Sequence, residues 1–235
     1  MDNTRDTLTA RLKSELELEL DPGRFKALAL SRLLSAPLEA AVEHPEIAGA
    51  GSTVSPSDYD LNPEIASDLA RALIPAAVLV PIYAHRAPTV LLTERTAHLS
   101  AHAGQIAFPG GKIDPNDRDA TAAALREAAE EIGLDPALAE PLGFLEPYRT
   151  STGYLITPVV ALLQPSFRPA ADPAEVADVF EVPLSFLMDA GNHRIDTRQW
   201  RGAERRFYAM PYEQRYIWGA TAGIIRTLYR RLFTA

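Results

Sequence analysis

Three glutamates, Glu127, Glu130 and Glu131, have the spacing of neighbours on one helix. They follow a Pro-Gly-Gly turn at 109–111, where backbone without a Cβ allows a close approach to a ligand. The pair at 127 and 131 is unfavourable by roughly 0.2–0.5 kcal/mol unless a cation relieves it. Because Mg²⁺ and Mn²⁺ prefer carboxylate and phosphate oxygens, the pattern indicates divalent-metal chemistry on a phosphorylated substrate. The acidic run alone is also typical of a solvated helix face, which the adjacent glycine turn disfavours.

The helix that carries these glutamates is predicted over about 120–132. Asp119 is a good N-cap and Gly133 a good C-terminal stop. An apolar stripe is expected to face the core, and it comprises Thr121, Ala124, Leu125, Ala128 and Ile132. The three carboxylates should then converge on whatever lies opposite.

The elements around this helix predict a mixed α/β architecture. Strands are expected at 76–83, 89–93, 106–108, 143–145 and 155–163, a short helix at 184–188, a hairpin near 200–209 and a closing helix at 212–233. Since they show no regular βαβ repeat, we expect a mixed sheet sandwiched between helices. Residues 1–70 are predicted to be a helical extension with a Gly- and Pro-rich linker, and residues 71–235 the main domain. In the extension, helices are expected over 1–20, 25–42 and 63–73.

Composition excludes several classes. The 235 residues carry 31 acidic and 23 basic side chains, a formal charge of −8, which argues against non-specific nucleic-acid binding. The absence of cysteine excludes disulfides, thiolate zinc sites and a cysteine nucleophile. Neither a signal core nor a membrane-length apolar run is recognisable, so we expect a cytoplasmic protein, monomeric or homodimeric, with a small-molecule substrate.

The segment 126–134, REAAEEIGL, resembles the second half of the Nudix box, in which R-E-apolar-x-E-E-x-G-apolar follows an earlier glycine and glutamate. The first half departs from it. When the box spacing is counted back from Arg126, Arg118 occupies the position of the earlier glutamate and Lys112 the position of the glycine. A one-residue insertion after Gly111 would instead align Asp117 with the glutamate.

This resemblance implies a Nudix fold and a pyrophosphohydrolase that uses Mg²⁺ or Mn²⁺ to polarise a diphosphate and activate water. It implies that Glu127 and Glu131 are the main metal ligands, that Glu130 is shared or bridging, and that the Gly111 carbonyl completes the shell. Arg126 would orient a glutamate by ion pairing. Glu175, in a later loop, would act as a ligand or general base, although solvation explains that residue equally well.

A second stretch, 91–111, resembles the signature of coenzyme A pyrophosphatases, roughly LLTxR, a leucine and H-x-G-x-x-x-FPGG. It implies hydrolysis of coenzyme A or its derivatives to 3′,5′-ADP and 4′-phosphopantetheine or its acyl form. Candidate substrate contacts are Arg95, His102, Tyr154 and, as a weaker basic candidate, Arg149. Three of them have a structural alternative: an ion pair for Arg95, a turn cap for His102 and core packing for Tyr154. Trp218 is expected to pack on the last helix.

Three other readings remain. A Nudix hydrolase for ADP-ribose or NADH shares the box but not the 91–111 signature. A non-catalytic nucleotide-binding module would be favoured by loss of box glutamates, and none is lost here. An isopentenyl-diphosphate isomerase shares the fold but typically uses a catalytic cysteine, which this chain lacks.

Overall fold

A ten-residue apolar strand, β1 (Ile74–Tyr83), lies at the centre of the main sheet. It runs parallel to β7 (Tyr154–Leu163) and antiparallel to β2 (Thr89–Arg95) and β4 (Gly110–Lys112). The sheet is completed by β3 (Ile106–Ala107), β5 (Ala139–Phe144), β6 (Tyr148–Arg149) and β8 (Val176–Pro183). Five strands lie in the order β3-β2-β1-β7-β5. In addition, β4 pairs with β1, β6 pairs with β7, and β8 pairs with β2. The predicted mixed sheet is therefore confirmed. The computed structural model describes residues 21–38, 56–63, 72–98, 104–200 and 203–234.

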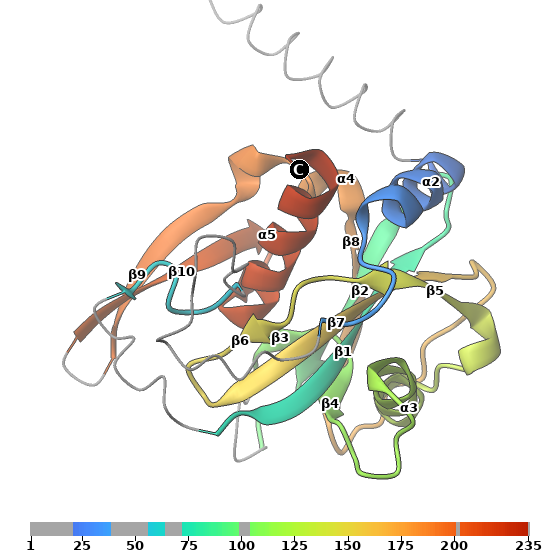
Figure 1. The fold of residues 1–235 in the computed structure, drawn as a ribbon, viewed down its shortest axis with the longest axis horizontal. Helices are drawn as coiled ribbons and strands as arrows, with labels where there is room; N and C mark the ends of the chain where they lie inside the picture. Colours follow the sequence, from blue (N-terminus) through green and yellow to red (C-terminus); the bar gives the residue numbers. More distant parts are fainter. Residues whose placement is uncertain (1–20, 39–55, 64–71, 99–103, 201–202, 235) are drawn as a thin grey trace, which may run out of the picture.

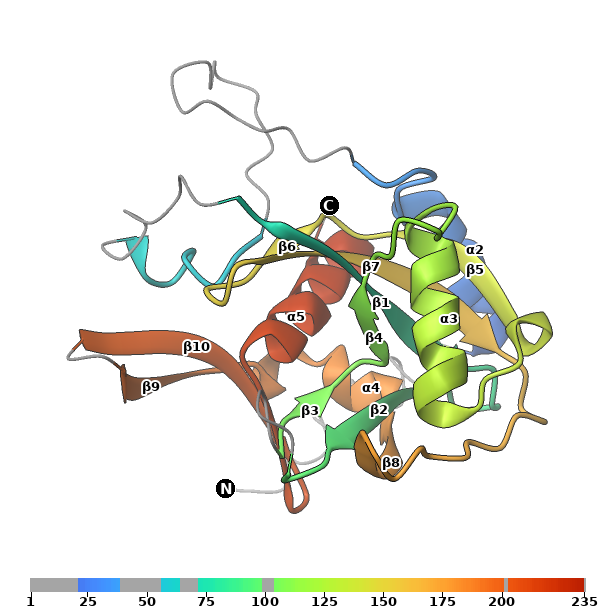
Figure 2. The same ribbon diagram turned by 90° about the horizontal axis from the view of Figure 1, so that it is seen from below.

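Alternate residues of the central strands point to opposite faces of this sheet. Ala77 and Leu79 of β1 pack with α3 (Ala120–Ile132), and Val80 and Ile82 pack on the opposite side. That side is covered by α2 (Pro22–Arg32) and α5 (Ala220–Phe233) (Figure 2). The result is an α/β/α sandwich in which β1 and β7 are buried between two helical layers.

A second, three-stranded antiparallel sheet follows the main one and is made of β9 (Arg194–Trp200), β10 (Ala203–Tyr212) and β11 (Arg215–Trp218). Its β9–β10 ribbon extends away from α3 (Figure 1). The short helix α4 (Leu184–Leu187) links β8 to this sheet, and single 3₁₀ turns lie at Pro136–Leu138 and Ala190–Asn192. A hydrogen bond of 2.9 Å from the Thr221 hydroxyl to the Ile106 carbonyl ties α5 to β3.

The single closing helix predicted over 212–233 is wrong in its first third. Residues 215–218 form β11, and α5 begins only at Ala220. Two left-handed backbone positions account for this: Glu213, with φ 51°, makes the hairpin turn, and Gly219, with φ 65°, ends the strand. The apolar spacing of this stretch therefore combines a strand and a helix.

Part of the segment assigned to the N-terminal extension packs on the core of the main domain. Phe25 and Ala29 of α2 are fully buried in the core beneath α5, and Leu34 bridges to Phe144 of β5. Pro22 opens α2, with Asp21 as its cap. The helices predicted over 1–20 and most of 63–73 fall outside the described residues. No helix in the described part of the chain is long and apolar enough to cross a membrane.

Candidate active site

The acidic helix forms where its sequence predicts. The Asp119 carboxylate accepts a hydrogen bond of 2.8 Å from the Ala122 amide, and Gly133 ends the helix in the left-handed conformation. The buried face is turned slightly from the expected stripe, because Thr121 and Leu125 are only half-buried. It consists mainly of Ala120, Ala123, Ala124, Ala128 and Ile132. These small alanines let the helix lie close to the sheet, which carries Glu131 into the interior.

Glu131 is a buried carboxylate whose polar contacts are long. Its side chain is 4% exposed, its Oε1 lies 3.5 Å from the Arg95 guanidinium, and its Oε2 accepts from the Gly110 amide at 3.3 Å. Burial raises the pKa of Glu131 to about 7, and Arg95 opposes this rise. A buried carboxylate held this loosely is a suitable ligand for a hard cation, since a cation at contact distance would offset its desolvation.

Glu127 lies against the backbone of Gly111. A Cβ atom added at Gly111 would meet the Glu127 carboxyl group at 2.5 Å, so any other residue there would displace that carboxyl group. The Glu127 side chain is 18% exposed, and its Oε1 accepts from Arg126 at 2.9 Å. Burial raises the pKa of Glu127, and the negative charges of Glu130 and Glu175 act in the same direction.

Arg126 connects the turn before the helix to the acidic residues. Its guanidinium binds the Asp117 carboxylate through two hydrogen bonds of 3.0 Å, and it donates to the Lys112 carbonyl at 3.1 Å. It also forms the expected ion pair with Glu127. Asp117, which the one-residue insertion would align with the earlier box glutamate, is thus bound to the helix through Arg126.

The prediction that three carboxylates converge is wrong for Glu130. Its side chain is 60% exposed and paired with Arg126 at 3.2 Å, and it lies outside the pocket that Glu127 and Glu131 line. Its i,i+4 spacing from Arg126 favours this surface ion pair. Within the described residues, no three His, Asp or Glu side chains stand ready as a metal cage. Two carboxylates are nevertheless sufficient for Mg²⁺, which usually keeps several waters and shares substrate phosphates.

A pocket of about 720 Å³ opens beside the acidic helix, between the main sheet and the second sheet. Among the predicted site residues, it is lined by Arg95, Gly111, Glu127, Glu131, Tyr154 and Glu175. Glu175 is close enough to raise the pKa of both Glu127 and Glu131. Arg149 does not line this pocket; it lies over the Tyr59 ring at 5.6 Å, so its predicted substrate contact is not supported. His102 falls outside the described residues.

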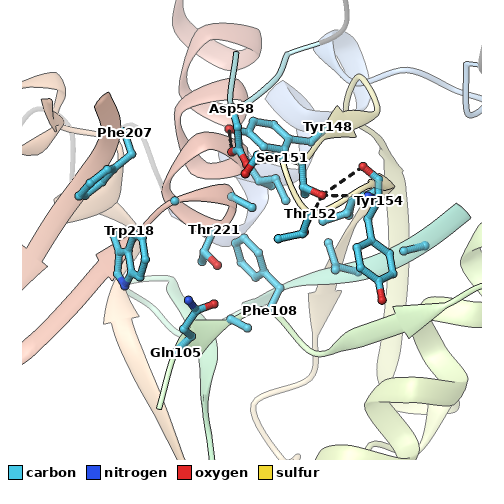
Figure 3. Close-up of a pocket in the computed structure, with 18 of the residues that line it drawn as sticks. Asp58, Gln105, Phe108, Tyr148, Ser151, Thr152, Tyr154, Phe207, Trp218 and Thr221 are labelled. Carbon is cyan, nitrogen blue, oxygen red and sulfur yellow. Dashed lines mark hydrogen bonds between the residues drawn. The ribbon is translucent and has the colours of Figure 1, made fainter. Parts of the chain in front are cut away.

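Several pocket residues were not anticipated from the sequence. They are Asp58, Asn62, Gln105, Phe108, Tyr148, Arg198, Arg205 and Phe207. Trp218 was expected to pack on the last helix, but it ends β11 and faces the pocket beside Phe207 (Figure 3).

Asp58 lies at the rim of the pocket, where it accepts hydrogen bonds from the Tyr148 hydroxyl at 2.9 Å and the Ser151 amide at 2.8 Å. Burial and the nearby Asp58 raise the pKa of the Tyr148 hydroxyl far above its usual range.

Together, the sandwich and the site define a mixed α/β domain that presents helix carboxylates and a glycine turn to a pocket large enough for a nucleotide-sized ligand. The NUDIX domain profile matches residues 73–201. A relative from Photorhabdus laumondii described as "Uncharacterized Nudix hydrolase NudL" is 48% identical over 67% of this chain and 84% of its own length. The Escherichia coli K12 protein of the same description is 47% identical over 65% of this chain and 80% of its own length.

The chain therefore belongs to the Nudix family, and it is a pyrophosphohydrolase. Nudix hydrolases generally use divalent metal ions. Among solved structures, the NUDIX domain of Shewanella oneidensis NrtR complexed with ADP ribose is 26% identical and covers 51% of this chain and 78% of its own, with a TM-score of 0.39. A Caenorhabditis elegans Ap4A hydrolase is 22% identical and covers 46% of this chain and 80% of its own, with a TM-score of 0.41. These low scores add nothing to the assignment, which rests on sequence.

Proposed function

We propose that this protein hydrolyses the diphosphate bond of coenzyme A or its derivatives, giving 3′,5′-ADP and 4′-phosphopantetheine or the acylated form. The observation that carries this proposal is the place of the 91–111 stretch in the structure. Its residues Arg95, Gln105, Phe108, Gly110 and Gly111 all line the pocket beside the acidic helix. The described residues of the segment that resembles a coenzyme A signature thus contribute to one wall of the pocket rather than to a remote surface.

Glu127 and Glu131, with the Gly111 carbonyl, are the proposed holders of Mg²⁺ or Mn²⁺. A divalent ion supplies charge neutralisation on the diphosphate and a more acidic water. Arg126 fixes the Glu127 carboxylate on the glycine turn, and Arg95 lies beside Glu131 on the pocket wall, where it can contact diphosphate oxygens. Glu175 is the proposed proton acceptor, because it lines the pocket near both carboxylates and is exposed to solvent. Glu130 can join the site only if it leaves Arg126.

Product analysis tests the proposal directly. Coenzyme A is incubated with the protein and Mg²⁺ or Mn²⁺ in ¹⁸O-labelled water, and the products are identified by mass spectrometry. We expect 3′,5′-ADP and 4′-phosphopantetheine, with one labelled oxygen in whichever product carries the attacked phosphorus. ADP-ribose and NADH form the comparison panel. Much faster turnover of ADP-ribose than of coenzyme A would contradict the proposal while leaving the family assignment intact.

A further inference from the structure

The wall of the pocket opposite the main sheet belongs to the second sheet and carries two facing arginines. Arg198 of β9 and Arg205 of β10 are directly paired across the antiparallel ribbon, and both line the pocket. Directly opposed like charges destabilise an antiparallel pair, and an anionic ligand bound by both guanidinium groups would offset this repulsion. Arg198 is exposed and forms no ion pair with another described residue. Asp58, which also lines the pocket, accepts hydrogen bonds from the Tyr148 hydroxyl and the Ser151 amide.

Next to the arginines, the same face of the second sheet carries two aromatic rings. Phe207 is two residues beyond Arg205 on β10, and Trp218 is opposite Ala209, so all three share one face. The ring centroids of Phe207 and Trp218 are 5.1 Å apart with an interplanar angle of 58°. Both rings are half-buried and lie across the pocket from Tyr154 (Figure 3). Exposed aromatic faces beside cations are the elements that bind a nucleobase and its phosphates.

The opposite wall therefore differs in chemistry from the acidic end. Glu127 and Glu131 suit a metal-bound diphosphate, whereas this wall suits a second anionic group next to a flat base. An uncharged amide chain such as pantetheine would use neither the arginine pair nor the stacking surface. A substrate that spans the pocket would thus place its nucleoside on the second sheet.

We propose that Arg198, Arg205, Phe207 and Trp218 form a subsite for a purine nucleoside that bears a ribose phosphomonoester in addition to its diphosphate. The aromatic pair stacks on the base, and the arginine pair binds the phosphomonoester dianion. This inference rests on the proposed function for the identity of the nucleotide, and it names the residues that would distinguish coenzyme A from substrates without that phosphate.

Equilibrium binding tests the subsite without catalysis. Titration calorimetry without added metal compares 3′,5′-ADP with AMP, which differ by the 3′-phosphate, on the full chain. We expect the wild type to bind 3′,5′-ADP about tenfold or more tightly than AMP, the scale of a charge-assisted contact. Arg198→Gln and Arg205→Gln should remove this preference and leave AMP binding unchanged, and Arg198→Lys should keep part of it. Arg194→Gln removes the same charge from an exposed site on β9 outside the pocket and should change neither affinity.

The aromatic half of the subsite has its own readout. The chain has two tryptophans, so Trp200→Phe leaves Trp218 as the sole indole reporter. Both nucleotides should quench the fluorescence of Trp218. Trp218→Leu should weaken the binding of both nucleotides by a similar factor, and thermal unfolding should show that this variant is folded. Unchanged fluorescence at saturating nucleotide would overturn the stacking role.

Hydrolysis of coenzyme A and dephospho-coenzyme A by the wild type separates the two proposals. If coenzyme A is cleaved but the arginine variants keep the wild-type preference for 3′,5′-ADP, the subsite is wrong and the proposed function stands. If neither compound is cleaved but the arginine variants lose that preference, the subsite stands and the proposed function is wrong. Equal wild-type affinity for 3′,5′-ADP and AMP would overturn the subsite in either case.

Discussion

Arg126 shows how one side chain determines the geometry of the acidic end. A guanidinium has five donors in a rigid plane, and this one is shared among Asp117, Glu127, Glu130 and the Lys112 carbonyl. The turn between Lys112 and Asp117 is thereby fixed to the middle of α3, and Glu127 is held beside Gly111. The pKa of Asp117 is lowered chiefly by its hydrogen bond to Arg126, so this contact is with the charged carboxylate.

Glu131→Gln separates stability from activity. The buried carboxylate has only long contacts, so the amide should cost no stability, and the midpoint of thermal unfolding of metal-free protein should stay the same or rise. Turnover should fall about 100-fold or more, the scale of losing one electrostatic contact to the transition state. Unfolding is followed by circular dichroism and turnover by product release. Glu140→Gln, an exposed glutamate on β5, is the control, and near wild-type rates for Glu131→Gln would rule out an essential role for that carboxylate.

Gly111→Ala should act through Glu127. The new methyl group would displace the Glu127 carboxyl group, and a misplacement of about 1 Å can cost about 100-fold in rate. The measurement is kcat/KM for Gly111→Ala, Glu127→Gln and the double variant. Because both changes affect the same carboxylate, the losses should not add. Additive losses would show that Gly111 contributes independently, for example by its carbonyl.

At the scale of elements, local signals were enough for α3 and for the hairpin near 200–209, which is formed by β9 and β10, but not for β11. The helix could be located because its cap, its stop and its periodic alanines all lie within 119–133. The pairing of β9, β10 and β11 depends on register across a hairpin, and the residues 212–233 also satisfy helical spacing. The acidic end of the site was therefore predictable, whereas Arg198, Arg205, Phe207 and Trp218 could be assembled only by the tertiary pairing of strands.

Phe25→Ala tests whether α2 is part of the domain. Phe25 is fully buried beside α5 and β5, so its truncation should cost about 3–5 kcal/mol of unfolding free energy. Leu30 on the same helix is 58% exposed, and Leu30→Ala should stay within about 0.5 kcal/mol. Urea unfolding measures both. Equal small effects would mean that α2 is a separable appendage, as a domain boundary at residue 70 would suggest.

At the scale of the whole molecule, the pocket exists because three separate regions meet. The main sheet and α3 supply the carboxylates, the second sheet supplies the arginines and rings, and residues 56–63 supply the rim through Asp58 and Asn62. Asn62 binds both the amide and the carbonyl of Arg206 on β10, at 2.7 and 2.8 Å. The sequence resemblance covers the first region well and none of the third, which is why the rim was not predicted.

His193 lies where α4, β9 and α5 meet, and its protonation should weaken the whole fold. Its Nε2 contacts the Leu187 carbonyl at 2.7 Å and its Nδ1 faces the Arg226 guanidinium at 3.0 Å, so the neutral ring fits with Nε2–H donating and Nδ1 accepting. The Tyr229 ring packs edge-on at 5.2 Å, and Asp189 lies nearby. Burial lowers the pKa of His193, and the positive charge of Arg226 acts in the same direction. The hydrogen bond to the Leu187 carbonyl and the negative charge of Asp189 oppose this decrease.

Since the unfolded chain binds this proton near pH 6.5 and the folded protein binds it only at lower pH, the contribution of His193 to the unfolding free energy should decrease as the pH falls below about 6.5. Glu131 contributes in the opposite direction, because its raised pKa makes the folded protein bind a proton more tightly than the unfolded chain. The decrease should end once the pH is below the folded pKa, where both states carry the proton. His193→Gln should remove this contribution, whereas His85→Gln, which removes a half-buried imidazole elsewhere, should not. Urea unfolding at intervals from pH 7.5 to 5 measures the difference between the two variants. An equal slope for wild type and His193→Gln would show that this imidazole does not link the layers through its neutral form.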